Sequence, residues 1–289
     1  MKKILVTGGA GFIGSHLIEE LSKKKENIIT SLDNYSSGTK KNHVRGVKYI
    51  NGETKDISNI IEFKPDIVFH LGEYSRVEKS FDDIEKVWSY NSLGTYQVIN
   101  FCLKNNSKLI YAGSSTKFGD GGLGRSQTPY GWTKAANTEL IRCFGKWYGL
   151  KYAITYFYNV FGGRELRTGK YATLIGIFTE CALMKKPLPV VMPGTQKRNF
   201  THIDDIISGL ILVSDKGYGD NYGIGNDETY SIFEVAKLFG GNIERLPPRR
   251  GNRLMSNIDT TKTKKLGWEC KNSLNKYISI LKKNLTKTL

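Results

Sequence analysis

A glycine-rich turn near the N-terminus constrains the fold of this chain more than any other feature. Residues 3–7 form an apolar run that predicts a buried strand, Gly8, Gly11 and Gly14 predict a tight turn, and the amphipathic residues 15–24 predict a helix. Glycines in such a turn let the backbone bend sharply, admit a pyrophosphate to the helix N-terminus and let the helix pack closely on the strand. Flexible loops are also rich in glycine, but the flanking strand and helix favour a phosphate-binding turn.

The second predicted strand, residues 28–32, ends on an acidic residue, Asp33. A carboxylate there accepts hydrogen bonds from both ribose hydroxyls of an adenosine and repels a 2′-phosphate. We therefore expect NAD rather than NADP; the alternative is a turn aspartate that binds nothing. Asp56 follows a short strand and is expected to accept from the adenine amino group or to cap the next helix, two compatible roles. The other expected cofactor contacts lie in the glycine turn or near strand ends: Phe12, Ile13, Asn34, Ser37, Ile57, Leu71 and Gly72.

Strand and helix patterns alternate along the first half of the chain. Further strands are predicted at residues 47–50, 67–71 and 108–112, and helices at 88–103 and 128–148. Alternation of this kind is typical of an α/β fold with a doubly wound parallel sheet, in which ligands collect at the carboxyl ends of the strands.

Composition excludes several classes of protein. The 289 residues are 39% hydrophobic and 24% charged, as expected of a globular chain. They include no apolar run long enough to span a membrane, and the apolar N-terminal segment leads into the glycine turn, so we expect a cytoplasmic protein without a signal peptide. The four cysteines match no metal or redox spacing, which predicts buried free thiols and no metal site.

The formal net charge of +16 raises the question of a nucleic-acid partner. The lysines occur in short, scattered runs and not in a basic helix or an aromatic-studded sheet. We therefore expect a solvated surface and no nucleic-acid polymer as partner. A small anionic substrate would also suit the sign of the charge.

Tyr130 and Lys134 are one helical turn apart, so their side chains rise from the same face of the predicted helix. A neighbouring ammonium stabilises a phenolate. If Thr128 is the N-cap and Pro129 the first helical residue, Tyr130 also lies in the first turn, where the helix dipole favours an anion. Ser114, at a predicted strand end, can hydrogen-bond to the same substrate hydroxyl as Tyr130. The alternative is a surface Tyr–Lys pair; the upstream phosphate turn favours catalysis.

Several stretches together resemble the extended short-chain dehydrogenases/reductases, in particular the nucleotide-sugar epimerase/dehydratase family. The resemblance covers almost the whole chain. It rests on residues 7–14 (TGGAGFIG), Asp33-Asn34, His70-Leu71, Tyr130 with Lys134, residues 159–162 (NVFG), residues 198–205 (RNFTHIDD) and residues 266–268 (LGW).

The resemblance implies an NAD-binding Rossmann domain at residues 1–158 and, at 159–289, a smaller α/β lobe that binds a nucleotide-diphosphate sugar, with some return of the chain to the first domain. It also implies that Tyr130 is the acid/base, Lys134 holds the nicotinamide ribose and Ser114 positions the oxidised hydroxyl. Asn159, Arg198 and Arg249 match the family's diphosphate contacts; by chemistry alone Arg198 is a partly stacked surface arginine. A homo-oligomer is expected.

The chain departs from the family pattern in two places at the expected substrate site. Ser115 and Thr116 stand where dehydratases carry an Asp-Glu pair, and neither is a competent acid or base near neutral pH, so we do not expect 4,6-dehydration. Glu73 and Arg76 replace small residues; we expect them either to form a salt bridge with each other or to contact a bulky, hydroxylated sugar.

Together these features predict an enzyme that oxidises C4 of a nucleotide sugar to a 4-keto species. The chain also resembles, at lower specificity, the bacterial dehydrogenases that oxidise C4 of GDP-linked heptoses for capsule and other surface polysaccharides. This resemblance favours a 4-dehydrogenase, with Arg164, Arg167 and Lys170 receiving an anionic co-oxidant. The same three cations are alternatively a solvated loop. A nucleotide-sugar 4-epimerase, for example of UDP-hexoses, is the alternative reaction. A non-catalytic NAD-binding regulator is a further alternative, although the Ser, Tyr and Lys constellation argues against it.

Overall fold

The computed structural model describes residues 1–248 and 258–287, and its centre is a parallel sheet of seven strands in the order β11-β6-β5-β4-β1-β2-β3. Every neighbouring pair in this sheet runs parallel. The strands are β1 (Lys2–Thr7), β2 (Asn27–Asp33), β3 (Lys48–Asn51), β4 (Ile67–His70), β5 (Lys108–Ser114), β6 (Tyr152–Phe157) and β11 (Gly219–Ile224). The expected doubly wound α/β fold is therefore confirmed.

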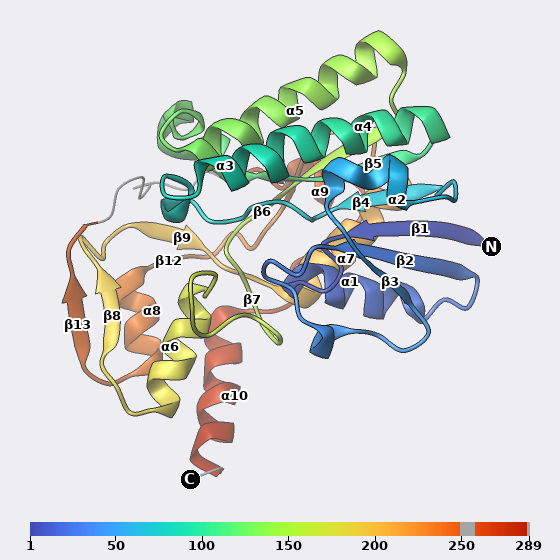
Figure 1. Ribbon diagram of the computed structural model, residues 1–289. Helices are drawn as coiled ribbons and strands as arrows, with labels where there is room; N and C mark the ends of the chain where they lie inside the picture. The colour runs from blue at the N-terminus through green and yellow to red at the C-terminus, as the bar shows by residue number, and fades with distance from the viewer. Residues whose placement is uncertain (249–257, 288–289) are drawn as a thin grey trace.

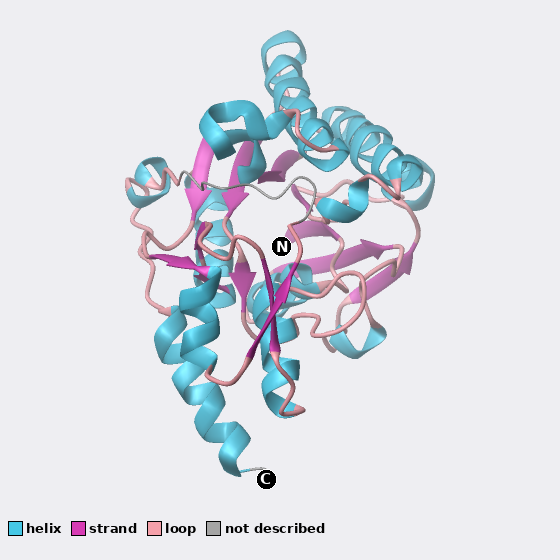
Figure 2. Ribbon diagram, turned by 90° about the vertical axis from the view of Figure 1, so that its left-hand side faces the viewer, coloured by secondary structure: helices cyan, strands magenta, loops and turns pink. Residues whose placement is uncertain are grey.

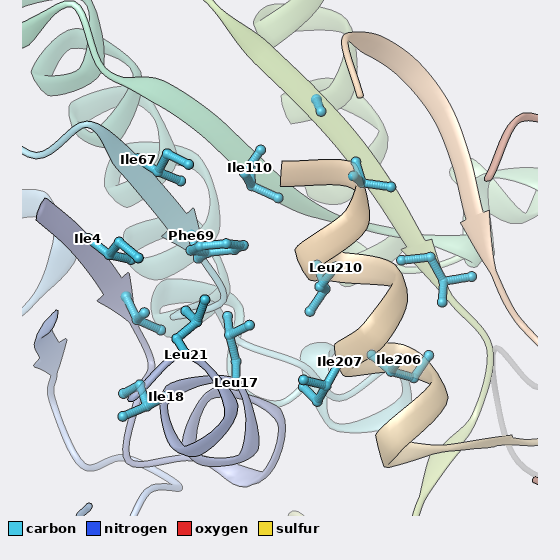
Figure 3. Close-up of a cluster of buried hydrophobic side chains, with 14 of the residues drawn as sticks. Ile4, Leu17, Ile18, Leu21, Ile67, Phe69, Ile110, Ile206, Ile207 and Leu210 are labelled. Atoms are coloured by element: carbon cyan, nitrogen blue, oxygen red, sulfur yellow. The ribbon is translucent and has the colours of Figure 1, made fainter. Parts of the chain in front are cut away.

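Helices lie on both sides of this sheet (Figures 1 and 2). One face is covered by α1 (Phe12–Ser22) and α7 (Ile203–Lys216), the other by α4 (Gly94–Asn105) and α5 (Pro129–Tyr148). Figure 3 shows Leu17 and Leu21 of α1 and Leu210 of α7 gathered around Phe69 of β4. Strands buried on both faces in this way read as continuous apolar runs, which explains why the sequence pattern located β1, β2, β4 and β5. The strands β6 and β11 were not predicted.

The remaining elements build a smaller lobe with a hydrophobic core of its own (Figure 1). Three two-stranded sheets belong to it: β7 (Val160–Phe161) with β10 (Thr201–His202), β8 (Leu188–Val191) with β13 (Ile243–Leu246), and β9 (Lys197–Asn199) with β12 (Thr229–Ser231). Its helices are α6 (Leu174–Leu183), α8 (Ile232–Phe239) and α10 (Leu274–Lys287). Between these segments the chain returns to the large sheet through α7 and β11, and the short α9 (Thr261–Lys264) follows later.

Two helix boundaries differ from the sequence expectation. Helix α1 begins at Phe12 and not at residue 15, so Gly14 lies inside its first turn, where a Cβ would come within 2.2 Å of the Gly8 carbonyl oxygen. The expected helix at 88–103 is a composite of α3 (Ile84–Val87), a π-helical segment η4 (Trp88–Leu93) and α4. Helix α5 matches its expectation: Thr128 is the N-cap, its Oγ1 accepts from the Gly131 N–H at 2.9 Å, and Pro129 is the first residue.

The cysteines agree only in part with the expectation of buried thiols. Cys102 is buried between α4 and the sheet, whereas Cys143, Cys181 and Cys270 are partly exposed. The last two lie at the margins of two hydrophobic clusters, where solvent still reaches them. A search of the described residues for a helix able to span a membrane found none.

Candidate active site

A cavity of about 610 Å³ lies along the carboxyl ends of the large sheet and extends to the smaller lobe. Its lining includes most of the site residues expected from the sequence. They are Gly8, Gly11, Phe12, Ile13, Gly14, Asp33, Asn34, Ser37, Leu71, Gly72, Glu73, Arg76, Ser114, Ser115, Thr116, Tyr130, Lys134, Asn159 and Arg198. The structure therefore brings residues from both halves of the chain to one place.

Two expected site residues, Asp56 and Ile57, do not line the cavity. Ile57 is fully buried in the hydrophobic cluster beneath α4, and Asp56 precedes α2 (Ile57–Ile60) at its N-cap position without a side-chain capping bond. Neither lines the cavity, so the structure does not support their assignment to the cofactor. Arg249 lies outside the described residues.

The glycine turn fits a dinucleotide. Gly8 has a φ of +73°, and a Cβ there would come within 2.8 Å of the Gly72 backbone, so a side chain would force the two loops apart. Gly11, the N-cap of α1, offers no side-chain cap, and the first turn of the helix carries no acidic residue. The N–H groups of that turn are thus available to a phosphate, as the helix dipole favours.

Asp33 is 6% exposed at the end of β2, and both of its carboxylate oxygens accept backbone hydrogen bonds. Oδ2 accepts from the Ala10 N–H and Oδ1 from the Tyr35 N–H, each at 2.8 Å. Burial raises the pKa of this carboxyl, while the two N–H donors act in the opposite direction. Each oxygen keeps a further acceptor position, as a ribose diol requires. This arrangement and the glycine turn suit the adenosine and pyrophosphate of NAD.

The three expected catalytic residues come from two neighbouring elements. Tyr130 is the second residue of α5 and half-buried, and Lys134 lies one turn later with 5% of its surface exposed. The Lys134 ammonium donates to the Ala112 carbonyl of β5, next to the strand end that carries Ser114. The Ser114 Oγ hydrogen-bonds to the Thr116 Oγ1 at 2.8 Å. All three residues line the cavity, so the pairing of Tyr and Lys is not a surface feature.

Glu73 has a role that sequence reasoning missed. Its Oε2 forms an ion pair with the Lys134 ammonium and not with Arg76, so the alternative of a Glu73–Arg76 salt bridge is wrong. The other oxygen, Oε1, accepts from the hydroxyl groups of Thr95 at 2.8 Å and Tyr111 at 3.1 Å, and from the Asn137 amide at 3.0 Å. Four donors from three elements thus surround one buried carboxylate.

His70 extends this network away from the cavity. Its imidazole is fully buried, with Nε2 3.0 Å from the Thr95 Oγ1 and Nδ1 2.7 Å from the Thr7 Oγ1. Because the Thr95 hydroxyl donates to Glu73, we assign the proton to Nε2, which then donates to Thr95 while Nδ1 accepts from Thr7. Burial lowers the pKa of His70 to about 4, so the ring is neutral near pH 7. It is a packed strand-end residue.

The cations expected to receive a co-oxidant do not line the cavity. Arg164 pairs with Glu19 of α1 at 2.7 Å, and Lys170 pairs with Asp83. Arg167 is exposed. The structure also places Tyr171 and Gln196 in the cavity lining, two residues that carried no motif in the sequence. Both come from lobe loops that only tertiary folding brings to the sheet.

Comparisons with known proteins agree with this geometry. The profile of the NAD dependent epimerase/dehydratase family matches residues 4–225. A putative UDP-glucose 4-epimerase of Methanocaldococcus jannaschii is 29% identical, with 97% of this chain and 99% of that protein covered. A UDP-N-acetyl-alpha-D-glucosaminuronate decarboxylase of Bacillus cytotoxicus is 34% identical over 82% of this chain and 78% of its own length.

Solved structures give the same result. The UDP-glucose 4-epimerase of Thermus thermophilus, in complex with NAD, superposes with a TM-score of 0.90 at 25% identity, covering 99% of this chain and 100% of that one. The UDP-glucose 4-epimerase of Thermotoga maritima, with UDP-glucose, gives 0.88 at 27% identity and covers 99% of both chains. With its glycine turn, its Asp33 and its Tyr130–Lys134 pair on one cavity, the chain belongs to the NAD-dependent epimerase/dehydratase family of enzymes that act on nucleotide sugars.

Proposed function

We propose that this enzyme is a nucleotide-sugar 4-epimerase of the UDP-hexose type. The observation that carries the proposal is the convergence of Tyr130, Lys134 and Ser114 on the cavity that also contains the NAD-binding turn. The full-length similarity to the UDP-glucose 4-epimerases of Thermotoga maritima and Thermus thermophilus supports this reaction among those of the family.

Two features argue against the competing reactions. Ser115 and Thr116 line the cavity at the positions where a dehydratase carries acidic residues. Their hydroxyls are too weak as acids and bases near neutral pH to catalyse the elimination of water. A net 4-dehydrogenase needs a second oxidant, and two of the three cations expected to receive it are paired with Glu19 and Asp83 outside the cavity. The GDP-heptose 4-dehydrogenase stays a prediction that no described contact favours.

Tyr130, Ser114 and Lys134 each have a distinct role in the proposed reaction. NAD, when bound, supplies the acceptor for the hydride that leaves C4. Tyr130 takes the proton from the C4 hydroxyl, Ser114 hydrogen-bonds to the same oxygen, and the Lys134 ammonium favours the ionised tyrosine. Once the 4-keto sugar has turned its other face to the reduced cofactor, which would return the hydride to C4, Tyr130 returns the proton to the oxygen.

The test is to incubate the purified enzyme with UDP-glucose, UDP-galactose and GDP-linked hexoses, once without any added oxidant and once with a 2-keto acid, and to determine the C4 configuration and mass of each product. We expect interconversion of the C4 epimers of at least one UDP-hexose at unchanged mass. A product lighter by one water would identify a dehydratase. A 4-keto product that accumulates only with an added 2-keto acid would identify a dehydrogenase, and either result contradicts the proposal.

A further inference from the structure

Arg76 places a guanidinium group in the wall of the cavity. Its Nη1 donates to the Ser75 carbonyl at 3.0 Å, its Nη2 donates to the Tyr171 carbonyl, and the group lies over the Tyr171 ring, 5.7 Å from the centroid. The Nε atom is buried and has no hydrogen-bond partner among the described residues. An arginine has five N–H donors, so this side chain keeps unused donors in the wall of the cavity.

The charge of Arg76 is also uncompensated within the described part of the chain, where no acidic side chain forms a salt bridge with it. Glu78, two residues along the chain, also lines the cavity but forms no salt bridge with Arg76, and Glu73 and Asp83 are engaged by Lys134 and Lys170. Burial of a cation is costly unless an anion compensates it. A partly buried guanidinium in a cavity wall, with no acidic partner among the described residues, therefore calls for an anion supplied by the ligand.

The position of Arg76 indicates which part of the ligand carries that anion. Arg76 lies three residues after Glu73, the ion-pair partner of Lys134, and it lines the same cavity as Tyr130. Because Tyr130 acts at C4 of the sugar in the proposed function, a cation beside it faces the hexose ring. The expected diphosphate contacts, Asn159 and Arg198, come from the loop after β6 and from β9.

We propose that Arg76 binds a carboxylate on the hexose, so that the preferred substrate class is a nucleotide-linked hexuronic acid. This inference rests on the proposed function, which makes the cavity a nucleotide-sugar site. In a hexuronic acid the carboxylate is attached to C5, next to the reacting carbon. A planar carboxylate matches the fork of a guanidinium, which binds it through two parallel hydrogen bonds.

The test measures binding to the NAD-loaded enzyme by calorimetry, with UDP-glucuronate, UDP-glucose and UDP as probes. We expect the wild type to bind UDP-glucuronate more tightly than UDP-glucose, and Arg76→Gln to lower this preference by about ten- to a hundredfold, as for the loss of a charged hydrogen bond. Arg76→Lys keeps the charge without the fork and should retain part of the preference. Arg167→Gln removes an exposed cation of the same region and should retain all of it.

Equal affinity of the wild type for the two sugars would overturn the inference, as would a preference that survives in Arg76→Gln. Loss of affinity for UDP itself in Arg76→Gln would place the guanidinium at the diphosphate and would also overturn it. The proposed function is tested separately. If the enzyme shows the Arg76-dependent preference but epimerises none of the sugars, the proposed function is wrong and the inference about Arg76 stands. Thermal unfolding of each variant checks that it is folded.

Discussion

Lys134 and Glu73 form an ion pair in which the two side chains are only 6% and 3% exposed. The lysine is therefore held at two points, by this carboxylate and by the Ala112 carbonyl, before any ligand binds. Its third N–H remains for the cavity that it lines. Glu73 fixes the position of the Lys134 ammonium, and its negative charge also weakens the effect of that ammonium on Tyr130.

The first prediction concerns this offset. Glu73→Gln keeps a hydrogen-bonding side chain but removes the negative charge, so Lys134 should stabilise the tyrosinate more strongly and activity should persist to lower pH. The titratable groups next to the pair are Tyr111, which donates to Glu73, and His70, which is neutral; Tyr130 lines the same cavity. A pH–rate profile measures the shift.

Loss of one partner of a buried pair also costs stability, about 3–5 kcal/mol. Denaturant unfolding of Glu73→Gln measures this cost, and Glu62→Gln, an exposed acid, is the control for the loss of one charge. If Glu73→Gln is folded and the acid side of its pH–rate profile coincides with that of the wild type, Glu73 has only a structural role.

The second prediction concerns the acid/base. Tyr130→Phe should still bind NAD, because no expected NAD contact other than the phenol is removed, but it should lose hydride transfer by about 10²–10⁴-fold. Single-turnover absorbance of the reduced nicotinamide measures the rate. Tyr148→Phe, at the exposed end of the same helix, is the matched control. A rate near that of the wild type would mean that Tyr130 is structural.

The third prediction concerns cofactor choice. Asp33→Asn should weaken NAD binding by about 1.5–3 kcal/mol, as expected for hydrogen bonds to a charged group, and should narrow the preference for NAD over NADP because the repulsion of a 2′-phosphate is lost. Fluorescence titration with each cofactor gives both affinities. Asp82→Asn changes an acid with 68% side-chain exposure and should leave them unaltered. Tighter binding of NADP by the wild type would contradict this role of Asp33.

The fourth prediction concerns pH and stability. Burial raises the pKa of Glu165 from 4.5 to about 7, although the Thr173 hydroxyl and the Gly162 N–H donate to its carboxylate. The native state therefore holds the proton up to about pH 7, whereas the unfolded chain releases it near 4.5. The stabilisation by this group is complete below pH 4.5 and is lost as the pH rises through 7, with a total of ~3 kcal/mol.

Glu165→Gln carries no proton to lose, so its stability relative to the wild type should be higher at pH 8 than at pH 5. Urea unfolding at the two pH values measures this difference. The exposed Glu269→Gln should show no such change. The same relative stability of Glu165→Gln at both pH values would refute the assignment.

Local features of the fold were predictable from the sequence, and long-range ones were not. The glycine turn and the N-terminus of α5 depend on neighbouring residues, so Thr128, Pro129 and Tyr130 could be placed in the first turn correctly. The partner of Glu73 comes from α5, and the contact of Arg76 with Tyr171 joins segments 95 residues apart. Such pairings depend on how the strands and the lobe come together, which no local pattern encodes.

The π-helical segment η4 has a further consequence. A π turn holds one residue more than an α turn, and one residue corresponds to about 100° of rotation around a helix axis. Asn91, within η4, hydrogen-bonds to the Tyr74 backbone, whereas Thr95, at the start of α4, reaches Glu73. Deletion of a single residue between them would turn Thr95 away and deprive Glu73 of a donor, although no residue of the cavity wall would change. A change in helix register, without any substitution in the cavity wall, would thus alter the hydrogen bonds to Glu73 and with them the electrostatic environment of Lys134.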